Sequence, residues 1–172
     1  DETIQHAGIV TGLGGYAGHS HKYKKKGGSG YLFRTSTVQD FSGVTGACLL
    51  VKTAVYDEMH GLDEQFAVAF NDVDFCLRVR DAGYRIAWTP YAELIHYESK
   101  SRGGDEKDPV KAARFAAEQQ RLYTIHGKEN ILDDPYYNPN LTRDREDFSE
   151  SDDLRRLKEG RVTVRFRGGI LQ

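Results

Sequence analysis

The sequence predicts an α/β fold, because strand-like and helix-like segments alternate along most of its 172 residues. Short apolar runs bounded by glycine or proline indicate strands. Two longer runs, each with a capping residue before it and a glycine after it, indicate helices. We therefore expect a mixed sheet flanked by helices, followed by a C-terminal helical and irregular extension.

The N-terminal region is predicted to contain one strand and one long loop. Residues 4–10 (IQHAGIV) form a short apolar run, and residues 11–31 contain seven glycines and a run of lysines: Lys22, Lys24, Lys25 and Lys26. This composition predicts a mobile loop and not a packed element. A lysine run of this kind is most often a solvated hairpin tip. The functional alternative is a lid that closes on a diphosphate.

The next segment is predicted to contain two strands and a short helix. Residues 38–41 are a candidate strand, and residues 46–51 form an apolar run whose length favours a buried strand. Thr53 can cap a helix that ends at Gly61. Gly46 and Ala47 are small either for packing or because a larger side chain would block a bound ligand.

Residues 71–83 carry the clearest helix signal in the first hundred residues. Asn71 or Asp72 can cap the helix, and Gly83 ends it. Two further strands are predicted downstream, over residues 84–88 and 92–97, with a Thr-Pro turn between them. An acid at a helix start and a histidine near a strand end, His96, can meet at one site.

The C-terminal part begins with a second clear helix. Asp108-Pro109 places a capping residue and a proline at the helix start, and the helix is expected to run to His126 before Gly127. The chain is densely charged from residue 142 to 159, which favours a surface helix or tail. Residues 161–170 alternate between polar and apolar as a strand would.

Composition excludes several classes of protein. The formal net charge of -2 gives no nucleic-acid footprint, and no apolar run approaches the roughly 20 residues that span a bilayer. Cys48 and Cys76 lie in apolar runs without a CxxC pattern, so we expect buried, reduced thiols in a cytoplasmic protein. The first residues lack the features of a signal peptide. Because the chain starts without Met, we expect it to be a piece of a longer protein.

Asp72-Val73-Asp74 is an Asp-x-Asp triplet at the predicted helix start. Two helical residues at this spacing point about 200° apart, so they do not easily share one ion. We interpret Asp72 as a candidate general base, because backbone N–H groups at a helix N-terminus hold a carboxylate in a fixed direction. Taken alone, it can equally be a plain cap. Asp74 is expected on the helix face, in an ion pair with Arg78 at i+4 or in contact with substrate.

Four segments, TGACLLV, GLDEQF, NDVDFCLRVRDAGYRI and TPYAELIHYES, follow in this order between residues 45 and 99. Together they resemble the C-terminal half of a family-2 glycosyltransferase with the GT-A fold. SRG at 101–103 and DPYYNPNL at 134–141 extend the resemblance to bacterial polysaccharide and O-antigen transferases. The resemblance implies that residues 1–104 are the acceptor-side half of the domain and residues 105–172 a C-terminal helix and charged extension. The nucleotide-binding half would then lie outside this sequence.

The resemblance also implies a reaction. A sugar would move with inversion from a nucleotide-diphosphate donor to a glycan or lipid-linked acceptor, with Asp72 at the position of the base. His96 matches the position of a ligand to a divalent Mn or Mg ion. Where the family usually has Glu-Asp, this chain has Asn71-Asp72. Substrate contacts are expected at Gly46, Ala47, Asp74, Arg78, Ser101 and Arg102.

The same resemblance implies a cytoplasmic enzyme at the inner face of the membrane, with peripheral membrane association of the full-length protein and no nucleic-acid partner. The isolated chain is expected to be inactive. Two alternatives stay open: a non-catalytic carbohydrate-binding module derived from a transferase, and a metal-dependent hydrolase. The hydrolase would need Asp72, Asp74 and His96 within about 2.5 Å of one ion. His96 can also be a strand-end histidine bonded to backbone, and Arg102 either a loop charge or a phosphate clamp.

Overall fold

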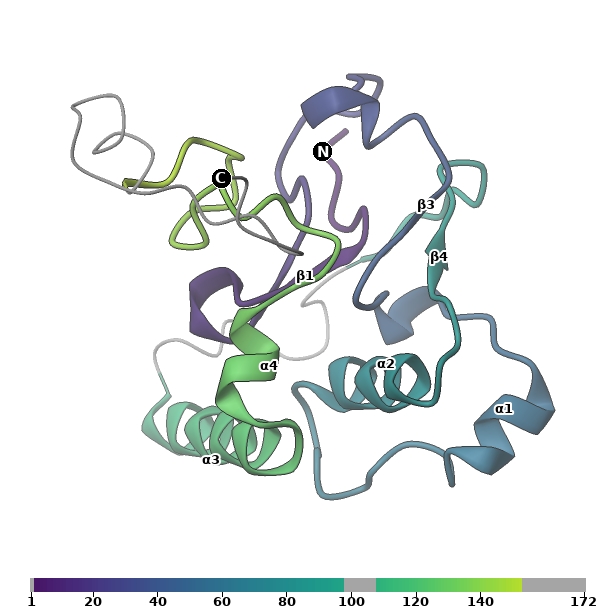
Figure 1. Ribbon diagram of the computed structural model, residues 1–172, viewed down its shortest axis with the longest axis vertical. Helices are drawn as coiled ribbons and strands as arrows, with labels where there is room; N and C mark the ends of the chain where they lie inside the picture. The colour runs from purple at the N-terminus through teal and green to yellow at the C-terminus, as the bar shows by residue number, and fades with distance from the viewer. Residues whose placement is uncertain (1, 98–107, 153–172) are drawn as a thin grey trace, which may run out of the picture.

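The computed structural model describes residues 2–97 and 108–152 (Figure 1). Helices and strands alternate along the chain, which confirms the predicted mixture of α and β structure. In order, the elements are β1 (Ile9–Thr11), η1 (Leu13–Gly15), β2 (Ala17–His19), η2 (Tyr31–Phe33), β3 (Gln39–Asp40), η3 (Gly46–Cys48), α1 (Thr53–Glu58), α2 (Asn71–Asp81), β4 (Ala87–Trp88), α3 (Pro109–His126) and α4 (Lys128–Leu132).

The strands form two small antiparallel sheets instead of the expected mixed sheet. In the first, β1 pairs with β2 so that Ile9 lies opposite His19. In the second, β3 pairs with β4 so that Gln39 lies opposite Trp88. Strands of two or three residues offer few backbone pairs, and a parallel pair would also need a long crossover connection. Within residues 2–97 and 108–152 the β structure therefore consists of a hairpin, β1 with β2, and a pair of distant strands, β3 with β4.

The first half of the glycine-rich stretch, residues 11–21, forms a packed hairpin, so the prediction of a mobile loop was wrong there, whereas residues 23–30 are exposed. The lysine run of the stretch is joined to the N-terminal segment by backbone hydrogen bonds, including one of 2.8 Å from the Ile4 N–H to the Lys24 carbonyl oxygen. Gly12 has a φ of 84° in the turn between β1 and β2, a conformation that glycine adopts readily. Four side chains of this stretch are almost fully buried: Thr11, Leu13, Ser20 and His21.

Two predicted strands do not form. Residues 46–48 make the short helix η3, capped by the Thr45 hydroxyl, which accepts a hydrogen bond from the Ala47 N–H at 3.4 Å. Cys48, expected to be buried, is exposed. Residues 92–97 have no regular structure, and Ile95 is 82% exposed. A β-prone segment becomes a strand only beside a partner strand, and the described part of the chain pairs none with these two segments.

The two clearest helix predictions are confirmed. α3 starts after Asp108, whose carboxylate accepts a hydrogen bond of 2.9 Å from the Val110 N–H, and it ends before Gly127. α2 starts at Asn71, but the residue before it, Phe70, takes the N-cap position with a left-handed φ of 64°. The cap predicted for α2, Asn71 or Asp72, was therefore wrong, whereas the cap and the proline predicted for the start of α3 are confirmed.

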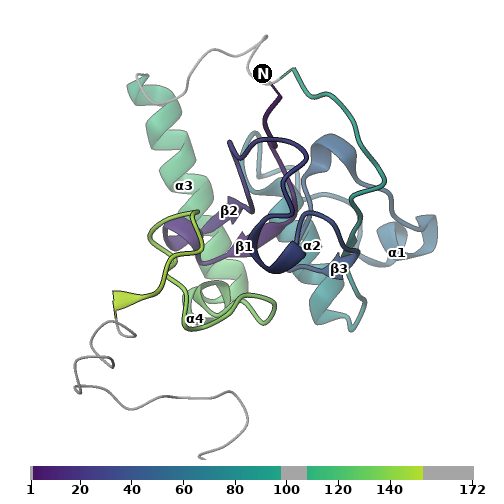
Figure 2. The same cartoon turned by 90° about the horizontal axis from the view of Figure 1, so that it is seen from above.

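Helix α2 lies between α1 on one side and α3 with α4 on the other (Figures 1 and 2). Its two sides enter different apolar clusters. Val73 and Leu77 pack with Ile9, Phe66, Phe70, Leu122 and Ile131. Cys76, Phe75 and Val79 pack with Val44, Val55 and Ile86. Since α2 is enclosed on both sides, the position of its first turn, which carries Asp72, is set by the core.

Two predictions concern parts of the chain outside the described residues, so they remain predictions. They are the domain boundary between 104 and 105 and the strand at 161–170. In the described part, α3 contributes Leu122 to the same apolar cluster as β1 and α2. None of the helices described is long and apolar enough to cross a membrane.

Candidate functional site

Asp72 lies in the first turn of α2, and backbone N–H groups hold both of its carboxylate oxygens. Oδ2 accepts a hydrogen bond of 2.8 Å from the Gly46 N–H, and Oδ1 accepts one of 2.9 Å from the Val73 N–H. The Asn71 side-chain oxygen accepts from the Asp72 N–H at 2.8 Å and fixes the turn. Asp72 is only half-buried. An oriented carboxylate that solvent can reach is suited to accept a proton.

The surface beside Asp72 is open. Gly46 and Ala47 are exposed, and they reach this position although 26 residues separate Gly46 from Asp72. A Cβ atom added to Gly46 would lie 3.5 Å from the Asp72 Cβ and 3.8 Å from its Oδ2. The glycine therefore keeps space free directly beside the carboxylate. Gly46 lies on the short helix η3 and not on the strand that was predicted there, and its predicted contact with substrate stays a prediction.

His6 supports this arrangement and was missed by the sequence analysis. Its Nε2 accepts hydrogen bonds from the Gly8 N–H at 3.2 Å and from the Thr45 N–H at 3.3 Å. Burial, with a smaller contribution from His19, lowers the pKa of His6 to about 3. The imidazole is therefore neutral and can accept both bonds at neutral pH. It fixes Thr45, the residue that precedes Gly46. No local sequence pattern distinguishes this histidine, because its partner lies 39 residues away.

His96 is connected to the same region through the N-terminal segment. Its Nδ1 lies 3.1 Å from the Gln5 side-chain oxygen, and the Gln5 carbonyl oxygen lies 3.2 Å from Nδ1 of His19. His19 in turn lies 3.3 Å from His6, ring nitrogen to ring nitrogen. Gln5 and His6 thus link the region of Asp72 to His96. Among the contacts of the described residues, none joins Asp72 and His96 directly.

The described residues do not assemble a metal centre by themselves. Over residues 2–97 and 108–152, no three His, Cys, Asp or Glu side chains are grouped so as to hold a metal ion. His96 is exposed, so its ring is accessible to an ion. Ser101 and Arg102, both predicted substrate contacts, also lie outside the described residues.

Asp74, two residues after Asp72, points into the protein. Its side chain is 1% exposed. Oδ2 accepts hydrogen bonds from Arg78 at 2.7 and 2.9 Å, and Oδ1 lies 2.8 Å from Nε2 of His126. Burial raises the pKa of Asp74, but the bonds from His126 and Arg78 outweigh it and hold the pKa below its ordinary value. The predicted i+4 ion pair is confirmed.

These contacts contradict two functions considered for Asp74, namely contact with substrate and ligation of a metal in a hydrolase site. An Asp74 that contacts substrate would need exposed surface, which this carboxylate lacks. The hydrolase site of Asp72, Asp74 and His96 does not form, because both oxygens of Asp74 are engaged by other groups. Arg78 also donates to the carbonyl oxygens of Met59 and, at 2.9 Å, Gly61. Arg78, proposed to bind substrate, therefore joins α2 to the end of α1.

Several known proteins are similar to this chain. One is a protein of Sinorhizobium fredii named uncharacterized protein y4gI, which is 48% identical over 149 residues, 86% of this chain and 16% of the relative. Another is the O-antigen biosynthesis protein RfbC of Myxococcus xanthus, 35% identical over 141 residues, 81% of this chain and 11% of the relative. A third is an N-acetylglucosaminyl-diphospho-decaprenol L-rhamnosyltransferase of Mycobacterium tuberculosis, 32% identical over 80 residues, 46% of this chain and 24% of the relative.

The names of two of these relatives, O-antigen biosynthesis protein and rhamnosyltransferase, support a relationship of this chain to glycosyltransferases of polysaccharide synthesis. The chain spans less than a quarter of the length of each relative described here. No protein-family model matches the chain. No solved structure matches it either.

Proposed function

We propose that this chain is the acceptor-side part of an inverting glycosyltransferase with the GT-A fold. The full-length enzyme would transfer a hexosyl or deoxyhexosyl group from a nucleotide-diphosphate donor to a glycan or lipid-linked acceptor in cell-surface polysaccharide synthesis. The observation that carries the proposal is Asp72, an oriented and accessible carboxylate beside a glycine surface. The relatives named for O-antigen synthesis and rhamnosyl transfer support the same reaction class.

In the proposed mechanism, Asp72 accepts the proton of the acceptor hydroxyl while that oxygen attacks the anomeric carbon of the donor. The bond from the anomeric carbon to the diphosphate breaks, and its electron pair leaves with the phosphate oxygen. The Gly46 N–H donates a hydrogen bond of 2.8 Å to Oδ2 of Asp72, and this bond keeps the carboxylate in one orientation during the attack. The absence of a side chain on Gly46 leaves room for the acceptor.

We propose a divalent Mn or Mg ion as cofactor, to which His96 would contribute an imidazole ligand. The ion would neutralise charge on the leaving diphosphate. We also propose that the enzyme acts at the cytoplasmic face of the membrane, as a peripheral protein, because a lipid-linked acceptor would lie there. The 172-residue chain alone is expected not to turn over, since the nucleotide-binding half is proposed to lie elsewhere.

Incubation of the full-length protein with a panel of nucleotide sugars, Mn²⁺ and lipid-linked glycan acceptors tests the proposal. The expected result is release of nucleotide diphosphate with a product whose new linkage has the inverted anomeric configuration by NMR. The 172-residue chain, assayed in parallel, should release none. Binding of a glycan without any transfer by the full-length protein would instead favour the non-catalytic carbohydrate-binding module. Full turnover by the chain alone would refute the proposal that half of the donor site is missing.

A further inference from the structure

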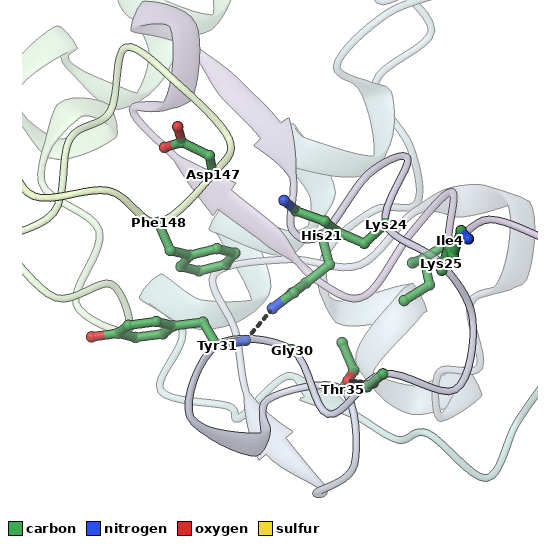
Figure 3. A pocket seen from close by; sticks show the side chains of 10 residues that line it. Ile4, His21, Lys24, Lys25, Gly30, Tyr31, Thr35, Asp147 and Phe148 are labelled. Carbon is green, nitrogen blue, oxygen red and sulfur yellow. Dashed lines mark hydrogen bonds between the residues drawn. The ribbon is translucent and has the colours of Figure 1, made fainter.

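A cavity of about 450 Å³ lies apart from Asp72 and has no role in the proposed mechanism. Three segments line it: the N-terminal segment at Ile4, the loop that follows β2, and the residues Asp147 and Phe148 near the end of the described chain. Figure 3 shows the rings of His21, Tyr31 and Phe148 gathered on one side of the cavity. The volume lies within the range of small-molecule sites, about 300–1,000 Å³.

The aromatic side of the cavity is rigid and uncharged. The Phe148 ring stacks on Tyr31 with an interplanar angle of 8°, and it lies 4.4 Å from the His21 ring, centroid to centroid. Both nitrogens of His21 have partners: the Ser20 hydroxyl at 2.7 Å and the Tyr31 N–H at 3.0 Å. Burial, together with nearby Arg34 and Lys24, lowers the pKa of His21 to about 4. A flat apolar surface of this kind suits the face of a sugar ring.

The backbone around this cavity is strained. Among the described residues, seven non-glycine residues have a positive φ, and five of them line the cavity or lie in its loop: His21, Tyr23, Leu32, Phe33 and Phe148. Each such conformation costs on the order of 1–3 kcal/mol and tends to cluster at binding and catalytic sites. Strained backbone therefore gathers around this cavity, which makes it a candidate for a functional site.

Two ammonium groups at the edge of the cavity form no ion pair with any of the described acidic side chains. Lys26 in the same run forms an ion pair with Glu93, whereas Lys24 and Lys25 line the cavity and are exposed, without an ion pair in the described part of the chain. Asp147 is the carboxylate among the lining residues, and hydrogen bonds from Ser149 hold its pKa below the ordinary value, so it is ionised. The edge thus offers two cations and one hydrogen-bond acceptor.

We propose that this cavity binds a sugar residue that carries a phosphate group, with the phosphate at Lys24 and Lys25 and the sugar ring against Phe148 and Tyr31. Asp147 would accept hydrogen bonds from sugar hydroxyls. The choice of a sugar phosphate rests on the proposed function, whose donor and lipid-linked acceptor both contain this chemistry. The cavity would hold the substrate at a point separate from the carboxylate of Asp72.

Binding of glucose 1-phosphate to the 172-residue chain, followed by amide chemical shifts in NMR, tests this inference. We expect shifts at Gly28, Gly30 and Tyr31, and an affinity at least about tenfold weaker in the Lys24→Ala/Lys25→Ala variant, since two charge-assisted contacts are lost. Lys22→Ala is the matched control, because Lys22 belongs to the same run but does not line the cavity and lies over the Tyr23 ring. It should bind as wild type does.

Two further probes separate the parts of the ligand. Methyl glucoside and inorganic phosphate should each bind more weakly than glucose 1-phosphate. Equal affinity for inorganic phosphate would overturn the sugar contact, and no shifts at these amides, or the same loss in Lys22→Ala, would overturn the site. The Asp72→Asn variant should bind glucose 1-phosphate unchanged. A failure of this inference is thus distinguishable from a failure of the proposed base, which is read from transfer and not from binding.

Discussion

Removing the charge of Asp74 tests whether the second acid of the Asp-x-Asp triplet is structural. Asp74→Asn keeps the shape of the side chain but replaces an oxygen acceptor by an NH₂ donor. That donor would face either Arg78, which now bonds Oδ2 at 2.7 and 2.9 Å, or His126, which lies 2.8 Å from Oδ1. Facing Arg78, the NH₂ group would leave the guanidinium without an acceptor; facing His126, it would need the neutral ring with Nε2 as acceptor. In either case the guanidinium loses its counter-charge.

The expected loss of stability follows from burial. Breaking a buried ion pair by removing one partner costs about 3–5 kcal/mol. The Arg78 side chain keeps 26% exposure and also bonds the carbonyl oxygens of Met59 and Gly61. We therefore expect the lower end, about 3 kcal/mol. For a protein of this size, such a loss lowers Tm by roughly 6–12 °C.

Urea and thermal unfolding followed by circular dichroism at pH ~7 measure this loss. Asp40→Asn is the matched control: its ion-pair partner Arg85 is 80% exposed, so solvent screens the pair and only a small loss of stability is expected. Because the pKa of Asp74 is lower in the folded state, its stabilisation is present at neutral pH and is lost as pH falls below about 4. The gap between wild type and variant should therefore close in acid. A loss no larger than that of Asp40→Asn would refute the structural role.

Three other predictions concern His6, Gly46 and the two cysteines. Burial lowers the pKa of His6 to about 3, so on acidification this histidine takes up a proton in the unfolded chain before it does in the folded one. The free energy of unfolding should therefore fall by about 1.6 kcal/mol from pH ~6.5 to ~5. His6→Gln should remove that share of the slope in urea unfolding, and an unchanged slope would count against it. Gly46→Ala should retain transfer by the full-length protein, since the added Cβ meets Asp72 at 3.5 Å, an ordinary contact. Gly46→Leu should abolish transfer without unfolding the chain, and normal transfer would show that the space beside Asp72 is not used. Cys48 is exposed, whereas burial raises the pKa of Cys76 to about 11. A thiol reagent at pH ~8 should therefore modify Cys48 quickly and Cys76 only on unfolding, and equal rates would contradict the burial of Cys76.

The sequence predicted the elements whose signals are local. Asp108-Pro109 and Gly127 bound α3 correctly, and the acidic start and Gly83 located α2. The i+4 pair of Asp74 and Arg78 also follows from helix geometry alone. These signals depend on residues within about one turn of each other, so no knowledge of the tertiary structure was needed.

The sequence did not correctly predict features that depend on residues far apart in the chain. The apolar runs at 46–51 and 92–97 have the composition of strands, but the described chain places no strand beside either of them. The contact of His126 with Asp74 joins residues 52 apart, and that of His6 with Thr45 joins residues 39 apart. Neither has a spacing that a sequence pattern could reveal. The glycines at 11–31 were interpreted as flexible, whereas Gly12 serves a tight turn in a packed hairpin.

The most direct test of the account compares sugar transfer by the full-length protein with that of its Asp72→Asn variant. Asp81→Asn, at the other end of the same helix and 63% exposed, is the matched control. The account predicts that Asp72→Asn lowers the rate of transfer at least about a hundredfold, leaves donor binding unchanged, and keeps the free energy of unfolding within about 1 kcal/mol of wild type. Asp81→Asn should transfer normally. Transfer by Asp72→Asn near the wild-type rate would contradict the assignment of Asp72 as the base.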